Sequence, residues 1–137
     1  MSKFLLDTHA WVWLIQDDKK LSHANSQLME DARASLQLFV SVISIWEVAL
    51  LVQRERLQLE RSLESWLDLS FTGGAVQMAG LTREIAIEST RLPGEFHRDP
   101  ADRILAATAR TEDLTLLTRE KRMLNYARQG HLRARRV

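Results

Sequence analysis

Five acidic residues stand at places in this sequence where carboxylates could hold a metal ion together. They are Asp7, Glu47, Asp99, Asp102 and Glu120. Carboxylates that are brought together repel one another, so such an arrangement is costly unless a cation neutralises it. The chain has no cysteine, which excludes thiol catalysis and a thiolate metal site. Oxygen ligands of this kind suit Mg²⁺, for which Mn²⁺ is a common substitute.

Three of these acids also have a purely structural explanation. Asp7 could cap a helix that begins at about His9. Asp99 and Asp102 fit the N-cap and the third residue of a helix, where acids favour the positive helix end. Their spacing nevertheless places both carboxylates near one side of the first helical turn.

Glu47 and Glu120 differ in how easily a structural role explains them. Glu47 is the only charged residue in the apolar segment 37–51, so we expect it to be partly buried. A buried carboxylate needs a cation or hydrogen-bond donors, and the alternative is a salt bridge to an arginine. Glu120 lies within residues 119–122 (REKR), which is also typical of an exposed helix start.

The elements that must position these acids alternate between strands and helices. We expect strands at residues 3–6, 38–42, 75–78 and 115–117, with a possible edge strand at 132–133. We expect helices at residues 9–16, 25–34, 44–54, 63–69, from the cap Thr82 to before Pro93, from Asp99-Pro100 to 110, and 119–127. This alternation predicts a single three-layer α/β/α sandwich with a mostly parallel sheet of four to five strands. In such sheets ligands bind beyond the carboxyl ends of the strands, where the acids fall.

Length and composition are those of one ordinary globular domain. The 137 residues suit a single hydrophobic core, and 45% apolar with 27% charged residues is unlike disordered or membrane proteins. The N-terminal residues lack the features of a signal peptide, so we expect a cytoplasmic protein without a membrane segment. The net charge is only +1, but basic residues gather after Arg119: Lys121, Arg122, Arg128, Arg133, Arg135 and Arg136. They could offset an acidic pocket when a polyanion docks, or form a solvated surface.

Four segments together resemble the PIN domain and, within it, the VapC toxins. They are residues 5–9 (LLDTH), 41–47 (SVISIWE), 98–109 (RDPADRILAATA) and 116–120 (LLTRE), in the family's order and across almost the whole chain. The resemblance implies that Asp7, Glu47 and Asp102 bind the metal. It adds Asp99 as a further acid of the subgroup that carries D-P-x-D-R.

The same resemblance places other residues around these acids. The family's fourth acid, often Asp or Asn, falls on the longer Glu120, which leaves its direct ligation open. Thr8, Ser44 and Thr118 fall where small hydroxyls could hydrogen-bond the acids or a metal-bound water, with helix capping as the alternative.

Histidines and tryptophans are not required for this chemistry. We expect His9 and His97 at the surface or in loops, with an RNA contact as the alternative. Trp11, Trp13, Trp46 and Trp66 could stack on bases, but their helical spacing favours the core or a dimer interface.

The resemblance implies a Mg²⁺-dependent ribonuclease that hydrolyses phosphodiester bonds with an activated water, one or two ions being left open. Asp99 or Glu120 could orient that water, and Arg98 and Arg103 could bind phosphates. It also implies a homodimer and a VapB-like antitoxin whose C-terminal segment blocks the acidic pocket.

Two other functions are compatible with parts of the pattern. Phosphoryl transfer through an aspartyl phosphate also uses an acid like Asp7 at the end of a first parallel strand. Enzymes of that class usually add a second Asp two residues later, where His9 stands. The other alternative is a nucleic-acid-binding or oligomerising module whose acidic site has decayed, with Glu120 as the sign of decay.

Overall fold

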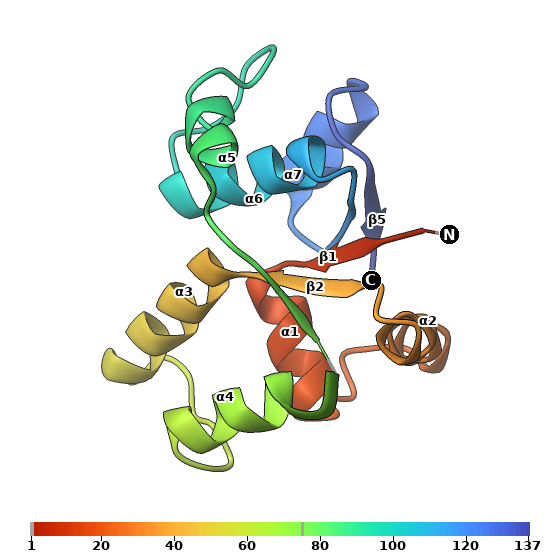
Figure 1. The fold of residues 1–137 in the computed structure, drawn as a ribbon, viewed down its shortest axis with the longest axis vertical. Helices are drawn as coiled ribbons and strands as arrows, with labels where there is room; N and C mark the ends of the chain where they lie inside the picture. Colours follow the sequence, from red (N-terminus) through yellow and green to blue (C-terminus); the bar gives the residue numbers. More distant parts are fainter. Residues whose placement is uncertain (1, 75) are drawn as a thin grey trace.

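The computed structural model describes residues 2–74 and 76–137, and it is built on a sheet whose five strands pair in parallel (Figure 1). The strands are β1 (Phe4–Leu6), β2 (Leu38–Ser41), β3 (Gln77–Ala79), β4 (Thr115–Thr118) and β5 (Ala134–Arg136). Their order is β3-β2-β1-β4-β5, so β1 lies at the centre. This confirms the predicted parallel sheet.

Helices cover both faces of this sheet. They are α1 (Thr8–Ile15), α2 (His23–Ala34), α3 (Val42–Gln53), α4 (Leu63–Phe71), α5 (Arg83–Glu88), α6 (Pro100–Thr111) and α7 (Lys121–Arg128), with a 3-10 turn at Thr72–Gly74. Figure 1 shows α5, α6 and α7 on one side of the strands and α1, α2 and α4 on the other. Helix α3 contacts both α1 and α6. The three-layer sandwich was therefore predicted correctly.

The two central strands explain why the sheet is covered on both sides. Leu5 and Leu116 are fully buried in the core formed with α5, α6 and α7. Their neighbours Leu6 and Leu117 are equally buried in the core formed with α1, α2 and α4. Successive side chains of a strand point to opposite faces, so an uninterrupted apolar run requires two apolar layers.

Several helix starts were predicted from their capping residues. Asp7 caps α1, Thr82 caps α5 with its hydroxyl accepting from the Ile85 amide, and Asp99 caps α6 with Pro100 following. Helix α3 begins two residues earlier than predicted. Its cap is Ser41, whose hydroxyl accepts from the Ile43 amide at 3.1 Å.

Other boundaries shifted as well. Strand β5 begins at Ala134, beyond the predicted edge strand at 132–133, because Leu132 turns into the core instead of extending the strand. Strand β3 starts at Gln77, and residue 75 of the prediction lies outside the described residues. Helix α7 begins at Lys121 rather than Arg119.

The tryptophans divide between the interior and the surface. Trp11 and Trp66 are buried and pack together with ring centroids 4.7 Å apart, which confirms the core interpretation for these two. Trp13 is partly buried, and the guanidinium carbon of Arg119 lies 4.5 Å from the centroid of the Trp13 ring. Trp46 is 55% exposed.

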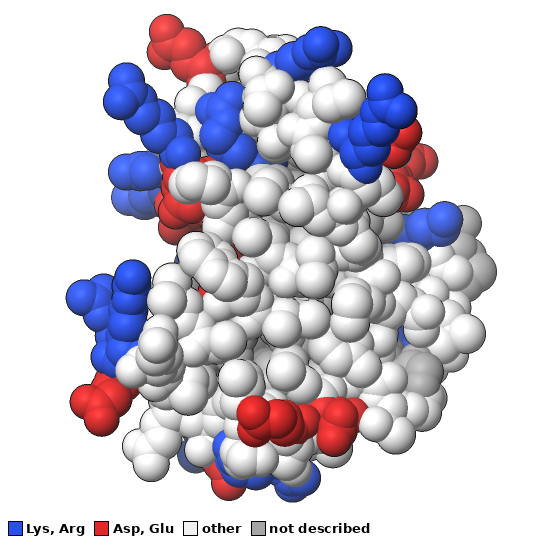
Figure 2. Space-filling view, turned by 60° about the vertical axis from the view of Figure 1, so that its left-hand side comes forward, with Lys and Arg blue, Asp and Glu red and all other residues white. Residues whose placement is uncertain are grey.

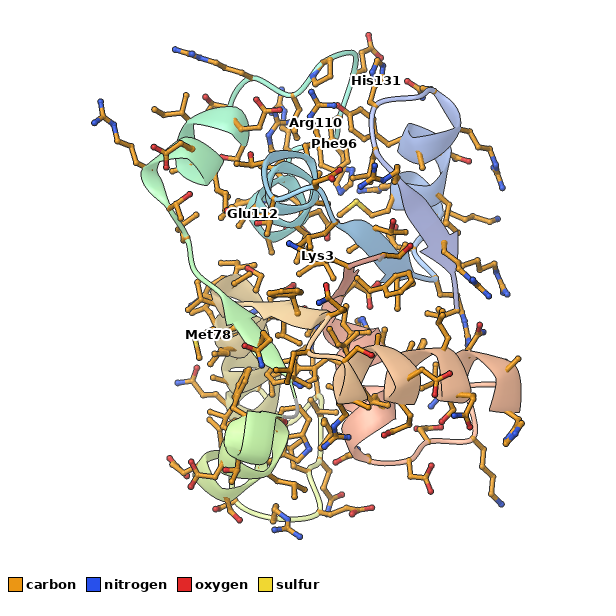
Figure 3. The ribbon with its side chains drawn as sticks, turned by 45° about the vertical axis from the view of Figure 1, so that its right-hand side comes forward. Lys3, Met78, Phe96, Arg110, Glu112 and His131 are labelled. Carbon is orange, nitrogen blue, oxygen red and sulfur yellow. The ribbon has the colours of Figure 1, made fainter. Side chains whose placement is uncertain are left out.

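One side of the molecule carries little charge. Figure 2 shows a mostly uncharged surface with charged groups at its edges, on the side where Figure 1 places α3 and α5. Large exposed apolar residues on α3, β3, α5 and the loop between β3 and α5 are Val42, Trp46, Met78, Leu81 and Ile87. Met78 is labelled on the edge strand in Figure 3. We call this set the apolar face.

No helix in residues 2–74 and 76–137 has both the length and the apolar character needed to cross a membrane.

Candidate active site

Asp7 occupies the junction between β1 and α1, at the carboxyl end of the central strand. Its Oδ1 accepts from the Ala10 amide at 2.8 Å, and its Oδ2 accepts from the Thr118 hydroxyl at 2.5 Å. Burial raises the pKa of Asp7 although both hydrogen bonds oppose that change, and the charge of Asp102 raises it slightly further. Asp7 is therefore both the predicted helix cap and an oriented acid of the site.

Glu47 reaches the same region from the second turn of α3. Its Oε1 accepts from the Thr8 hydroxyl at 2.5 Å, and the Thr8 and Ser44 hydroxyl oxygens are 3.0 Å apart. A hydroxyl has one proton, so Thr8 donates to Glu47 and accepts from Ser44. Burial raises the pKa of Glu47, and the nearby acids of α6 add to this effect. In the described part of the chain no ion pair involves Glu47, so the salt-bridge alternative was wrong.

Asp99 and Asp102 have different roles in the first turn of α6. Oδ1 of Asp99 accepts from the amide of Ala101 at 3.0 Å and caps the helix. The amide of Asp102 donates to the same Asp99 oxygen at 3.5 Å, but the Asp102 side chain takes no part in the cap. Oδ2 of Asp102 lies 2.6 Å from Nε2 of His97. Burial raises the pKa of Asp102, and the charges of Asp99 and Glu120 raise it further against the effect of His97.

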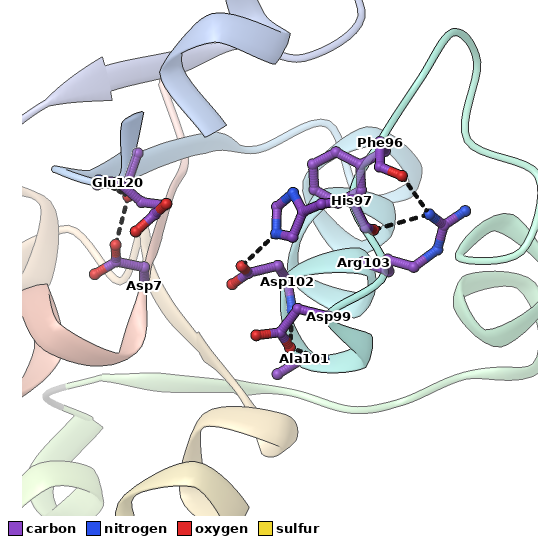
Figure 4. A network of polar contacts seen from close by, with 9 residues as sticks. Asp7, Phe96, His97, Asp99, Ala101, Asp102, Arg103 and Glu120 are labelled. Carbon is purple, nitrogen blue, oxygen red and sulfur yellow. Dashed lines mark hydrogen bonds and ion pairs between the residues drawn. The ribbon is translucent and has the colours of Figure 1, made fainter. Parts of the chain in front are cut away.

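Glu120 completes the set at the end of β4. It is exposed, and it occupies the N-cap position of α7 without a capping bond from its side chain. Its amide donates to the Thr118 hydroxyl at 3.0 Å. Figure 4 shows Asp7 and Glu120 facing Asp99 and Asp102 across one space.

The acids therefore form one electrostatic group, which we call the acidic site: Asp7, Glu47, Asp99, Asp102 and Glu120. The Asp102 charge raises the pKa of both Asp7 and Glu47. Asp7 and Glu120 follow strands, Asp99 and Asp102 lie in the first turn of α6, and Glu47 lies one turn further into α3.

The donor set of the acidic site fits Mg²⁺. Among residues 2–74 and 76–137, no three acidic, histidine or cysteine side chains lie close enough to form a ligand cluster by themselves. Mg²⁺ does not need one, because it keeps several waters and takes one or two protein carboxylates plus substrate phosphates. Oε2 of Glu47 and Oδ1 of Asp102 make no hydrogen bond with any described residue, so both are available to a cation.

The predicted hydroxyls contact the acids instead of capping helices. Thr8 and Ser44 form the hydroxyl pair beside Glu47, and both are buried. Thr118 is fully buried and holds Asp7. Such outer contacts fix the orientation of ligating side chains in metal sites.

His97 and Arg103 depart from their expected roles. His97 lies in a loop, as expected, but its side chain is only 16% exposed and contacts Asp102, a contact that was not predicted. Its position two residues before the Asp99 cap was the available signal. Arg103 donates from Nε and Nη1 to backbone carbonyls, which gives it a structural role in place of the expected phosphate contact. Arg98 is exposed.

Part of the basic C-terminal region, which begins beside Glu120 in the sequence, lines a surface hollow. Arg119, Lys121, Arg128 and Arg136 contribute to this hollow of about 460 Å³ beside α7. Arg119 is partly committed elsewhere, because it donates to the carbonyls of Val137 and Lys20, both at 2.7 Å. His9 is exposed, as expected.

The fold and the acidic site together define a class of protein. The PIN-domain family model matches residues 4–129, and the chain belongs to this family. The chain is 36% identical over 126 residues to "Ribonuclease VapC22" of Mycobacterium tuberculosis. This alignment covers 92% of this chain and 93% of that relative.

Solved structures share this fold at low sequence identity. A DNA-bound VapBC structure from Salmonella typhimurium aligns with TM-score 0.69 and 20% identity, covering 99% of this chain and 98% of the other. A toxin-antitoxin complex from Klebsiella pneumoniae aligns with TM-score 0.55 and 21% identity over 88% and 90% of the two chains.

Proposed function

We propose that this chain is a divalent-metal-dependent ribonuclease and the toxin of a VapBC-type pair. The observation that carries the proposal is the acidic site, in which burial raises the pKa of Asp7, Glu47 and Asp102 at one end of a parallel sheet. A group of acids with raised pKa values is characteristic of a functional site. The name of the 36% identical relative supports RNA as the substrate.

The proposed roles follow from how each carboxylate is held. Asp7, Glu47 and Asp102 would hold Mg²⁺, or Mn²⁺ in its place, one or two of them directly and the rest through waters on the ion. Neighbouring donors fix the orientation of all three carboxylates. When bound, the ion would lower the pKa of a water molecule and stabilise charge on the scissile phosphate.

Asp99 and Glu120 are the exposed acids of the site, and one of them would orient the attacking water. The water oxygen would bond to phosphorus while the acid accepts a water proton. The bond from phosphorus to the leaving oxygen would break, and that oxygen would keep the electron pair and take a proton from solvent. The exposed Arg98, next to Asp99, would contact the RNA phosphates.

The residue two positions after Asp7 makes the aspartyl-phosphate alternative less suitable. Enzymes of that class usually place a second aspartate there. The position two residues later is the exposed His9 rather than a second aspartate.

Partners form the second part of the proposal. We propose that two copies associate through the apolar face, where exposed aliphatic and aromatic side chains adjoin a mostly uncharged surface (Figure 2). We also propose a cognate VapB-like antitoxin that blocks the acidic site. The solved toxin-antitoxin complex from Klebsiella pneumoniae shares this fold.

RNA cleavage by the purified chain with Mg²⁺, Mn²⁺ or EDTA tests the enzymatic proposal. The Asp7→Asn variant should be inactive, because asparagine still caps α1 but lacks the charge of the site. The matched control is Asp31→Asn, an exposed acid on α2, which should cleave like the unaltered chain. Cleavage that persists in EDTA, or in Asp7→Asn, would rule the proposed chemistry out.

A further inference from the structure

His97 holds one oxygen of Asp102 and leaves the other free. Nε2 of His97 is 2.6 Å from Oδ2 of Asp102, and the two side chains are 16% and 24% exposed. Oδ1 makes no hydrogen bond within the described residues. A carboxylate tied at one oxygen cannot rotate freely, so its second oxygen keeps a fixed direction. Figure 4 shows this carboxylate between His97 and the space that contains Asp7.

The loop that carries His97 is packed against α7 by a row of aromatic rings. The ring centroids of His97 and Phe96 are 4.4 Å apart, those of Phe96 and Tyr126 are 4.7 Å apart, and those of Tyr126 and His131 are 5.0 Å apart. Tyr126 is almost completely buried, and its hydroxyl donates to the Pro93 carbonyl at 2.5 Å. Phe96 and His131 are labelled beside α6 and α7 in Figure 3.

Gly94 lets the loop approach His131 closely. Its φ is +67°, a conformation that favours glycine, and a Cβ atom there would lie 2.8 Å from Nε2 of His131. Any larger residue would strain the backbone here and would require the His131 ring or the loop to shift.

Arg103 holds the loop from the side of α6. Its Nη1 donates to the carbonyls of Phe96 and His97 at 3.1 and 3.0 Å, and its Nε donates to the carbonyl of Ser89 at 2.9 Å. Arg103 directly follows Asp102 in the chain. Arg103 therefore holds the backbone of His97, while the side chain of His97 holds the neighbouring Asp102.

We infer that His97 is a positioning residue for the metal-binding acid Asp102, in a loop that Tyr126, His131 and Arg103 hold in place. His97 donates from Nε2 to Oδ2 and directs Oδ1 toward the acidic site. This inference rests on the proposed function, because it assumes that Asp102 binds a divalent cation. Partners of this kind affect metal affinity by roughly 10- to 100-fold when removed.

Mn²⁺ titration calorimetry on three variants tests the inference. His97→Leu removes the donor, His97→Gln keeps a donor at a similar distance from the backbone, and Glu95→Gln is the control on an exposed residue of the same loop. We expect His97→Leu to weaken Mn²⁺ binding by about tenfold or more. His97→Gln should recover most of that loss, and Glu95→Gln should bind like the unaltered chain.

Thermal melting in EDTA separates positioning from general destabilisation. If His97→Leu is folded and binds Mn²⁺ normally, or if His97→Gln is as weak as His97→Leu, the inference is overturned. If His97→Leu does not fold, Tyr126→Phe replaces it, since this variant keeps the ring and loses only the bond to Pro93. Weaker Mn²⁺ binding by Tyr126→Phe supports the inference, and normal binding overturns it.

RNA cleavage by the same samples keeps this inference distinct from the proposed function. An unaltered chain that binds Mn²⁺ but cleaves no RNA would refute the ribonuclease proposal, while the affinity series would still decide the role of His97.

Discussion

Thr118→Val should destabilise the protein through the acid that Thr118 orients. The side chain is fully buried, its hydroxyl donates to Oδ2 of Asp7, and it accepts from the amide of Glu120. Valine has nearly the same shape, so the substitution removes hydrogen bonds and leaves no large cavity. A hydrogen bond to a charged group contributes about 1.5 to 3 kcal/mol. The Glu120 amide lies at an exposed helix start, where water can replace the lost acceptor.

The expected loss in the free energy of unfolding is therefore about 1.5 to 3 kcal/mol. For 137 residues, an unfolding entropy of about 2.1 cal/mol/K per residue converts this loss into a Tm lower by about 5 to 10 °C. Thr118→Ser is the control, because it keeps the hydroxyl and loses only a methyl group worth about 0.8 kcal/mol.

The pH dependence of the Tm difference between Thr118→Val and the unaltered chain identifies Asp7 as the source of that difference. The Thr118 bond favours the charged carboxylate, so its contribution is present above the pKa of folded Asp7 and is lost as pH falls through that pKa. Thermal melts in EDTA at about pH 7.5 and about pH 4.5 should show the difference between Thr118→Val and the unaltered chain shrinking at the lower pH. A Tm within about 2 °C of the unaltered chain at the higher pH would refute the reasoning.

Three further predictions concern the acids themselves. Glu47→Gln should leave the Tm in EDTA unchanged or raised while RNA cleavage falls, because it removes a repelled charge and keeps an acceptor for Thr8; a clear fall in Tm would contradict this. Asp102→Asn should weaken Mn²⁺ binding and cleavage more than Asp99→Asn, since asparagine can still cap α6; calorimetry and cleavage assays giving the reverse order would exchange the two roles. Burial raises the pKa of Asp7, Glu47 and Asp102, so ionising them costs stability above their folded pKa values and this cost disappears as pH falls through them. In EDTA their contribution should therefore favour a higher Tm at about pH 5.5 than at about pH 8. Saturating Mn²⁺ should raise the Tm more at the higher pH, and an equal Mn²⁺-induced rise in Tm at both pH values would count against a metal held by these acids.

The sheet and its acids were predictable because each depends on a local pattern combined with topology. Leu5 and Leu6 are apolar on both faces of one strand, which indicates a strand covered on both sides. Once parallel order is assumed, Asp7 and Glu120 must meet at one end of the sheet.

Contacts between loops and helices could not be predicted in the same way. The contact of His97 with Asp102 depends on how residues 93–98 pack on Tyr126, which no periodicity records. Arg103 follows Asp102 in a segment that carries both arginines and acids, which suggested a phosphate contact. Its donation to backbone carbonyls is visible only in the folded chain.

Boundary errors arose where two adjacent signals were similar. Ser41 and Ser44 are both good helix caps by residue type. In the folded chain Ser41 accepts from the Ile43 amide, while Ser44 contacts Thr8. Strand β5 contains Ala134, Arg135 and Arg136, which show no clear apolar alternation, so its register depends on pairing with β4.

The Thr118–Asp7 hydrogen bond joins residues that are 111 positions apart. During synthesis from the N-terminus, Asp7, Glu47, Asp99 and Asp102 are all made before the hydroxyl that orients the first of them. A nascent chain that stops before β4 therefore contains four of the five acids but cannot complete the arrangement around Asp7. If the protein is the proposed toxin, its ability to damage RNA is delayed until Thr118 has been translated and β4 has paired with β1.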